Sequence, residues 1–407
     1  MRFSLRGRRA SSSHENERAN EVAHMNPLTL FFVVFAFYNL FGLVNTPWTS
    51  EGAYDKTLGW QLFLIGCFGF LLGSALTRKT TSRRPISVLQ PRTSRQLTFV
   101  FLALFSTCVV TTIALSGGIP LLQGEERFGN SALMFNLAQL YGFWELVRTI
   151  SDAEAGRRFR VFQPILYLTG ALCFGYRTPI LMFMLVLLLY FAVFRLAVRK
   201  ALLICLSVGI FIVGFSAVFA AFRVSQNYDL VLFFKNIDFR FTRENPYLLP
   251  FVPAMAMFDF SQQTVATIGT SLHEFMYGEL FLSNYETFLP GKHWGARNII
   301  GDITGARWVA GRPMSITPTL QGALYVDFSY YGVFFGFFLL ASGIKRLWRM
   351  ALHWGPLGKF SFSYLLALSI MAVHNGYWDV GFVFFLLFLL VIRVFDALKA
   401  RFNHQPA

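Results

Sequence analysis

The sequence predicts an all-α, polytopic integral membrane protein with about ten transmembrane helices and one large loop of amphipathic helices on one face. Hydrophobic residues make up 55% of the 407 residues and aromatic residues 17%, which is too apolar for a soluble domain of this length. Ten long apolar segments run through the chain, and a bilayer span needs roughly 20 mostly apolar residues. Because lipid offers the backbone no hydrogen-bond partners, such spans are helical.

The predicted spans form two groups on either side of the large loop. Residues 28–222 hold seven spans and residues 322–396 hold three, with the loop at 223–321 and tails at 1–27 and 397–407. The spans are predicted at residues 28–44, 59–76, 97–115, 131–150, 161–175, 179–194, 201–222, 322–344, 361–377 and 380–396.

The net charge of +15 is a topology signal rather than a sign of nucleic-acid binding. With the N-terminus in the cytoplasm, most of the 36 Lys and Arg residues fall in the tails and in the connections on that same side. Every short connection then obeys the positive-inside rule, and the large loop is exempt because long segments translocate regardless of charge. We expect cytoplasmic termini, an outward-facing loop, contact with membrane lipids and no nucleic-acid partner.

The large loop contains two apolar stretches, Tyr247–Phe260 and Phe275–Phe288, that are too broken to span a bilayer. They are predicted to be amphipathic helices that lie against the membrane. A loop of this length usually has a function.

No motif for a metal, a nucleotide or a dinucleotide is present, and neither is a nucleophile elbow. The four cysteines lie far apart in apolar segments and are read as core residues: Cys67, Cys108, Cys173 and Cys205. We therefore expect no metal and no cofactor, and the energy for any reaction would come from an activated substrate.

Three outward-facing helix starts are each preceded by an arginine. They are Arg127 in GEERFGNSA, Arg177 in FGYRTPI, with Thr178 as N-cap and Pro179 following it, and Arg312 in GRPMSITPT. A helix N-terminus attracts anions, and arginine adds forked donors that suit phosphate oxygens. The alternative is that these arginines reach from helix ends to the head groups, which is more usual on the cytoplasmic face. The pattern favours a diphosphate site.

Acid–base candidates lie on the same outward side. His273 and Glu274 share a predicted helix in TSLHEFMYGEL, and either would serve as a base. Asp327, near the outer end of the eighth span, is expected to pair with an arginine or to act in catalysis, with pairing favoured. His374 and Asp379 flank a short outer turn and are weaker candidates.

Two further groups of residues complete the candidate set. Arg223, where the large loop begins, is a candidate supporting residue together with Asp327. The outer tryptophans would form an interface belt or stack on sugar rings: Trp48, Trp294, Trp308 and Trp378.

The chain resembles the oligosaccharide repeat-unit polymerases, the Wzy-type O-antigen polymerase family. The resemblance lies in the large loop and in three motifs: SGGIPLLQGEERFG (Ser116–Gly129), GYRTPIL (Gly175–Leu181) and SITPTLQGALYVDFSYYGVFFG (Ser315–Gly336). The family's last motif often has a glutamate and, after a phenylalanine, a glycine, where this chain has Gln321 and Ser329.

This resemblance implies a metal- and nucleotide-independent glycosyltransferase of the bacterial inner membrane, with a periplasmic loop. It would polymerise undecaprenyl-diphosphate-linked repeat units for O-antigen, capsule or exopolysaccharide, with a chain-length regulator as a partner. Arg127, Arg177 and Arg312 would hold the diphosphate, and His273 or Glu274 would activate the acceptor hydroxyl.

Three alternatives remain open on the sequence. An O-antigen ligase would transfer the glycan to a lipid A core on a similar architecture. A lipid-linked oligosaccharide flippase or other transporter would need charges around a central cavity, and intramembrane charge is sparse here. A receptor or scaffold would not explain the three arginine-marked helix starts.

Overall fold

The computed structural model describes residues 25–44, 54–77, 95–122, 132–158, 160–176, 178–225, 252–287, 294–306 and 315–403. Within these ranges the regular structure is helical, including one short 3₁₀ helix, η1 (Pro120–Leu122), and it contains no β-strand. The all-α prediction is therefore confirmed.

Each of the ten predicted spans coincides with a helix. These helices are α2 (Pro27–Leu43), α3 (Thr57–Leu76), α4 (Arg95–Ser116), α5 (Ala132–Glu154), α6 (Phe162–Cys173), α7 (Thr178–Phe194), α8 (Val198–Ser225), α14 (Thr319–Ala351), α15 (Gly355–Asn375) and α16 (Gly381–Asn403). In the described part of the chain, four helices are long and apolar enough to cross a membrane: α3, α4, α14 and α15. Helices α2, α6 and α7 are apolar but shorter. The number of crossings and the division of the chain at residue 223 stay predictions.

Phenylalanine rings fill the interfaces between the helices. Phe35 on α2 lies 5.5 Å from Phe63 on α3 and 4.6 Å from Phe337 on α14, measured between ring centroids. A second aromatic group joins α5 to α16, where Phe143 lies 5.6 Å from Phe388. These rings are buried, so the high phenylalanine content has a packing role inside the helix bundle.

Helices α3 and α14 approach each other at two glycines of α3. A Cβ added to Gly69 would lie 2.4 Å from the carbonyl oxygen of Phe334, and one added to Gly73 would lie 2.3 Å from that of Phe338. The two glycines are four residues apart and share a helix face, which is the small-residue spacing that lets membrane helices touch through their backbones. The α3–α14 interface therefore has no room for a side chain at either position.

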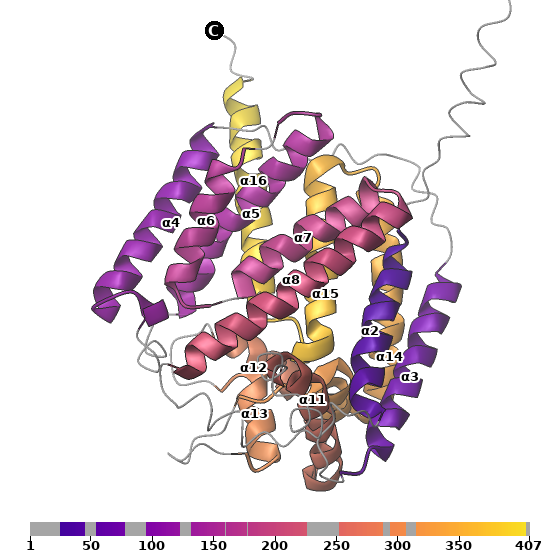
Figure 1. Ribbon diagram of the computed structural model, residues 1–407. Coiled ribbons are helices and arrows are strands. Elements are labelled where there is room, and N and C mark those ends of the chain that lie inside the picture. The colour runs from indigo at the N-terminus through magenta and orange to yellow at the C-terminus, as the bar shows by residue number, and fades with distance from the viewer. Residues whose placement is uncertain are drawn as a thin grey trace, which may run out of the picture.

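Three further helices gather at one end of the molecule, and we call them the shelf: α11 (Val252–Ser271), α12 (Glu279–Glu286) and α13 (Ala296–Ile303). Figure 1 shows the shelf at the end opposite to the C-terminus of the chain. The two ends of the molecule thus differ in architecture.

The bounds of the shelf helices differ from the predicted amphipathic stretches. The first stretch was expected to end at Phe260, whereas α11 continues through a polar segment to Ser271. Its polar side chains point inward: Ser261 and Gln262 are buried, and they bond to Tyr38 and Asn39 of α2. Hydropathy alone did not predict the extension to Ser271 because the buried face of the helix is partly polar there.

Helix α14 is broken at Phe328 and Ser329, near its shelf end. Phe328 has φ −139° and ψ 20°, and Ser329 has φ 59° and ψ −157°. The carbonyl oxygens of Val326 and Asp327 accept hydrogen bonds from the backbone N–H groups of Met276, at 3.0 Å, and Tyr277, at 2.9 Å. The segment between α11 and α12 therefore satisfies two carbonyl groups at the break.

Candidate functional site

Asp327 holds the shelf to the break in α14. Its side chain is fully buried, and Oδ1 accepts hydrogen bonds from the N–H groups of Gly278, at 3.1 Å, and Leu280, at 3.0 Å. Oδ2 accepts from the N–H of Phe281, at 3.0 Å, and from the hydroxyl of Tyr377, at 2.5 Å. Four donors compensate the burial of this carboxylate, and three of them are N–H groups at the start of α12.

The turn between α15 and α16, residues 376–380, packs on the start of α14. Gly376 has φ +101°, and a Cβ there would lie 3.2 Å from Pro318, so only glycine suits the position. The carbonyl oxygen of Trp378 accepts a hydrogen bond of 3.1 Å from Asn284 of α12. The turn is therefore fixed both to α14 and to the shelf.

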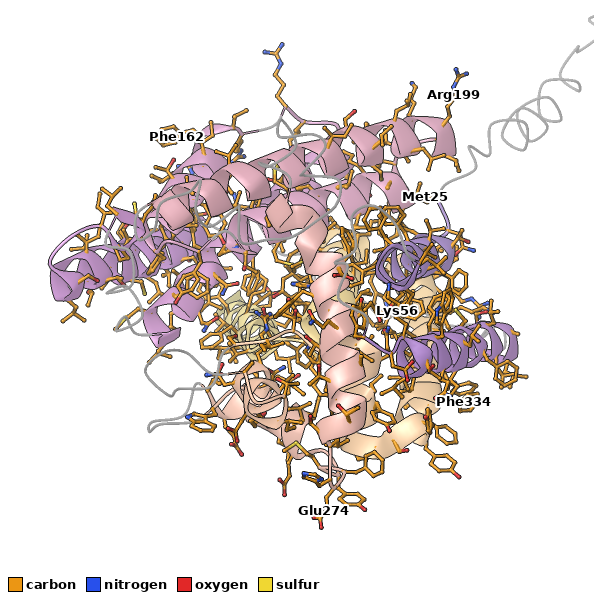
Figure 2. All side chains as sticks on the ribbon, turned by 60° about the horizontal axis from the view of Figure 1, so that its bottom comes forward. Met25, Lys56, Phe162, Arg199, Glu274 and Phe334 are labelled. Atoms are coloured by element: carbon orange, nitrogen blue, oxygen red, sulfur yellow. The ribbon has the colours of Figure 1, made fainter. Side chains whose placement is uncertain are left out.

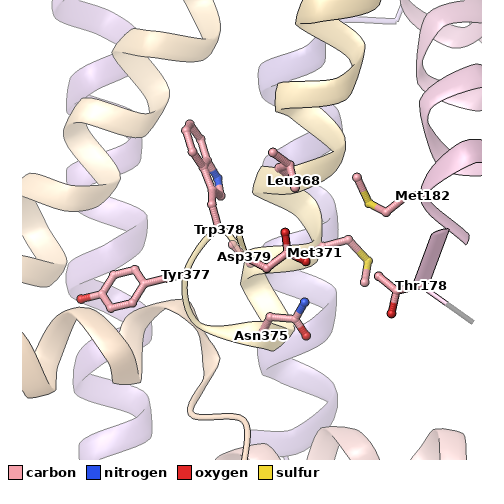
Figure 3. Close-up of a pocket in the computed structure, with 9 residues that line it drawn as sticks. Thr178, Met182, Leu368, Met371, Asn375, Tyr377, Trp378 and Asp379 are labelled. Carbon is pink, nitrogen blue, oxygen red and sulfur yellow. The ribbon is translucent and has the colours of Figure 1, made fainter. Parts of the chain in front are cut away.

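A small pocket opens between this turn, the end of α15 and the start of α7 (Figure 3). Its polar lining comes from Thr178, Asn375 and Asp379, whose side chains are directed toward the pocket in Figure 3. Its apolar lining includes Met182 and Met371. The space at its centre suits one hydroxyl-sized group, since it is close to the minimum that holds a single water.

Asp379 is the acidic group of this pocket. Its Oδ1 accepts a 2.9 Å hydrogen bond from the N–H of Gly381, the first residue of α16. Burial raises the pKa of the Asp379 carboxyl, whereas the guanidinium of Arg297 on α13 acts to lower that pKa. On α12, burial and the nearby Asp379 carboxylate raise the pKa of Tyr285 to about 12. The pKa of the carboxyl group in the pocket therefore depends on a shelf residue, Arg297.

The O-antigen polymerase family model matches residues 24–386, which is most of the chain. The chain belongs to the O-antigen polymerase family. The activity that this family is named for is polymer formation in polysaccharide synthesis, and the apolar helices identify this O-antigen polymerase homologue as a membrane protein. No curated protein and no solved structure shows a significant match.

Several candidate residues of this O-antigen polymerase homologue lie outside the described residues: Arg127, Arg177, Arg312, Trp48 and Trp308. Arg177 directly precedes Thr178, the first residue of α7 and a lining residue of the pocket. Arg223 lies in the last turn of α8, and its side chain is outside the description. The helices that follow these three arginines are α5, α7 and α14, which begin at Ala132, Thr178 and Thr319. The role of these helix starts as anion sites stays a prediction.

His273 and Glu274, the two candidate bases, lie in the connection between α11 and α12, so the prediction that they share a helix is wrong. Both side chains are exposed, and neither lines the pocket. Figure 2 shows Glu274 at the outer edge of the shelf, far from Arg199 at the other end of the molecule. Asp327 has four backbone and tyrosine donors as its observed partners, in place of the expected arginine.

A buried polar network in this homologue was not predicted from its sequence. The Tyr38 hydroxyl lies 2.8 Å from Ser261 Oγ and 2.6 Å from His374 Nδ1. Next to it, Asn39 Oδ1 accepts hydrogen bonds from the amides of Gln262 and Gln321. The network joins α2, α11, α14 and α15, and its His374 lies in the last turn of α15, just before the turn that carries Asp379. The available signal was the presence of Asn39 inside an apolar span, where polar residues require partners.

Proposed function

We propose that the protein polymerises undecaprenyl-diphosphate-linked oligosaccharide repeat units at the periplasmic face of the inner membrane. The observation that carries this proposal is the family match over residues 24–386. A pocket at the shelf end supports it, because Thr178 of that pocket follows Arg177, the strongest candidate ligand for a diphosphate.

In the proposed reaction an acceptor hydroxyl on one repeat unit attacks the anomeric carbon of the glycan on another lipid carrier. The new bond forms between the hydroxyl oxygen and that carbon, while the bond from the carbon to the diphosphate oxygen breaks. The electron pair leaves with the lipid diphosphate, whose negative charge Arg127, Arg177 and Arg312 would stabilise. The hydroxyl proton passes to a base, for which His273 and Glu274 are the candidates from sequence.

The test is polymerisation by the purified protein in detergent or nanodiscs. The substrate is the matching undecaprenyl-diphosphate-linked repeat unit, with a chelator present and no nucleotide, and the products are separated on a gel. We expect a ladder of glycans. A single unextended band from folded protein and the matching repeat unit would contradict the proposal. Addition of a lipid A core acceptor would then distinguish a ligase from a transporter.

A further inference from the structure

The pocket at the start of α7 offers a more specific assignment of the base, and this inference rests on the proposed function. Among the described residues that line the pocket, Asp379 carries the carboxylate. His273 and Glu274 are exposed in the connection between α11 and α12. A base must come within hydrogen-bond distance of the hydroxyl whose proton it takes, and a small pocket that opens beside Asp379 provides that proximity.

We propose that Asp379 is the general base that takes the proton of the acceptor hydroxyl. Thr178 and Asn375 line the same pocket and offer the hydroxyl and amide groups that would hold the acceptor oxygen. The O–H bond breaks as the oxygen forms its bond to the anomeric carbon, and the proton moves to a carboxylate oxygen of Asp379. Lipid diphosphate departs with the electron pair, so atoms and charge balance without any other reactant.

The contacts of Asp379 suit this role. Oδ1 accepts the N–H of Gly381, which orients the carboxylate at the first turn of α16. Asp379 is half-buried, which limits the water that competes for its proton. Among the described residues, the charged or titratable groups that interact with it are Arg297 from α13, Tyr285 from α12 and Tyr364 from α15. Of these Arg297 is the cation, so it favours the ionised form of Asp379, which is the form that accepts a proton.

Contacts with the shelf and with α14 hold the turn in place near Asp379. Asn284 of α12 bonds to the carbonyl of Trp378, and Tyr377 bonds to Asp327. Both contacts hold residues next to Asp379, so the pocket depends on α12 and α14 as well as on α15.

The test compares Asp379→Asn with Glu274→Gln, His273→Ala and the control Glu279→Gln, an exposed carboxylate of the shelf that does not line the pocket. All variants are assayed for ladder formation and for binding of the undecaprenyl-diphosphate-linked repeat unit. We expect Asp379→Asn to lower kcat by about 10²–10⁴-fold with donor binding retained, and the Glu279→Gln control to keep wild-type activity. Full activity of Asp379→Asn, or a loss confined to Glu274→Gln or His273→Ala, would overturn the assignment.

The pH profile separates a base from a purely structural carboxylate. The wild-type rate falls as the pH drops through the pKa of Asp379, because the protonated carboxyl cannot accept a proton. Arg297 lowers that pKa, so Arg297→Gln raises it and moves the acid limb to higher pH, while Arg297→Lys stays close to wild type. An acid limb that is unchanged in Arg297→Gln would overturn the proposal even if Asp379→Asn failed to fold. Absence of ladders from the wild type contradicts the proposed function instead.

Discussion

The hydroxyl of Tyr377 donates a 2.5 Å hydrogen bond to Oδ2 of Asp327. The two residues are 50 positions apart in sequence, one in the turn before α16 and the other next to the break in α14. The carbonyl oxygen of Ala323 lies 3.1 Å from the same hydroxyl and shares its single proton in a bifurcated hydrogen bond. Through this pair the shelf, the interrupted helix and the pocket turn form one connected structure.

Asp327→Asn is expected to destabilise the protein by roughly 2–4 kcal/mol, because its single carbonyl oxygen cannot replace a carboxylate that accepts four hydrogen bonds. Tyr377→Phe removes one donor only and should cost about 1 kcal/mol. Thermal unfolding of the purified variants measures both effects. Equal unfolding temperatures for the two variants and the wild type would show that this junction contributes nothing to stability.

Ser329→Gly is expected to stabilise the protein. Ser329 has φ 59° and ψ −157°, a conformation that glycine adopts far more readily than a residue with a Cβ. Relief of this strain should exceed the entropy cost of glycine and leave a net gain of about 1 kcal/mol. Ser329→Ala retains the Cβ and should show no gain. A higher unfolding temperature for Ser329→Ala than for Ser329→Gly would contradict the strain argument.

Gly73→Ala is expected to separate α3 from α14, because the added methyl group would lie 2.3 Å from a backbone oxygen that cannot move alone. Overpacking of this kind costs about 1–3 kcal/mol. The matched control is Gly343→Ala on α14, where a Cβ would meet nothing within 4 Å. Unfolding temperatures in detergent should fall for Gly73→Ala and hold or rise for the control. The close-contact interpretation fails if the two substitutions behave alike.

Arg177→Ala is expected to lower the polymerisation rate by about 100-fold, by the loss of a donor that stabilises the departing diphosphate. Arg199→Ala, at an exposed arginine of the opposite end, is the control and should retain the wild-type rate. The measurement is the ladder assay at equal amounts of folded protein. Full activity of Arg177→Ala would remove the central residue of the proposed diphosphate site.

The predicted topology can be tested with single cysteines in a background without the four native ones. Glu274→Cys lies on the shelf and Arg199→Cys lies at the other end of the molecule (Figure 2). A membrane-impermeant maleimide added to intact spheroplasts should label Glu274→Cys at once and Arg199→Cys only after permeabilisation. Labelling of both positions, or of Arg199→Cys alone, would contradict a periplasmic shelf and cytoplasmic connections.

The helices of the bundle were predictable because each long apolar segment forms one. Thr178 shows how local this signal is: a threonine before Pro179 predicts a helix start, and α7 begins there. The break at Ser329 was not predictable from hydropathy, since the predicted span runs without interruption through residues 322–344. Its position follows from tertiary hydrogen bonds to Met276 and Tyr277, which are distant in sequence.

The candidate site was predictable only in part. The outer turn and its flanking Asp379 stood out as polar residues between two apolar segments. The partners of Asp327 and Asp379 could not be predicted from the sequence, because backbone N–H groups and shelf residues approach these carboxylates only in the folded chain. Ser261 and Gln262 likewise have the polarity of surface residues, and only the structure shows that they face inward and bond to α2.

The break in α14 divides this helix into two mechanical parts. Beyond Ser329, Phe334 and Phe338 are locked against the glycines of α3, so that part moves only together with α3. Before the break, Asp327 and Ala323 are tied to α12 and to the pocket turn. Because α11 is also bonded to α2, and the turn is continuous with α15 and α16, the break joins two firmly held parts of one helix and is no free hinge.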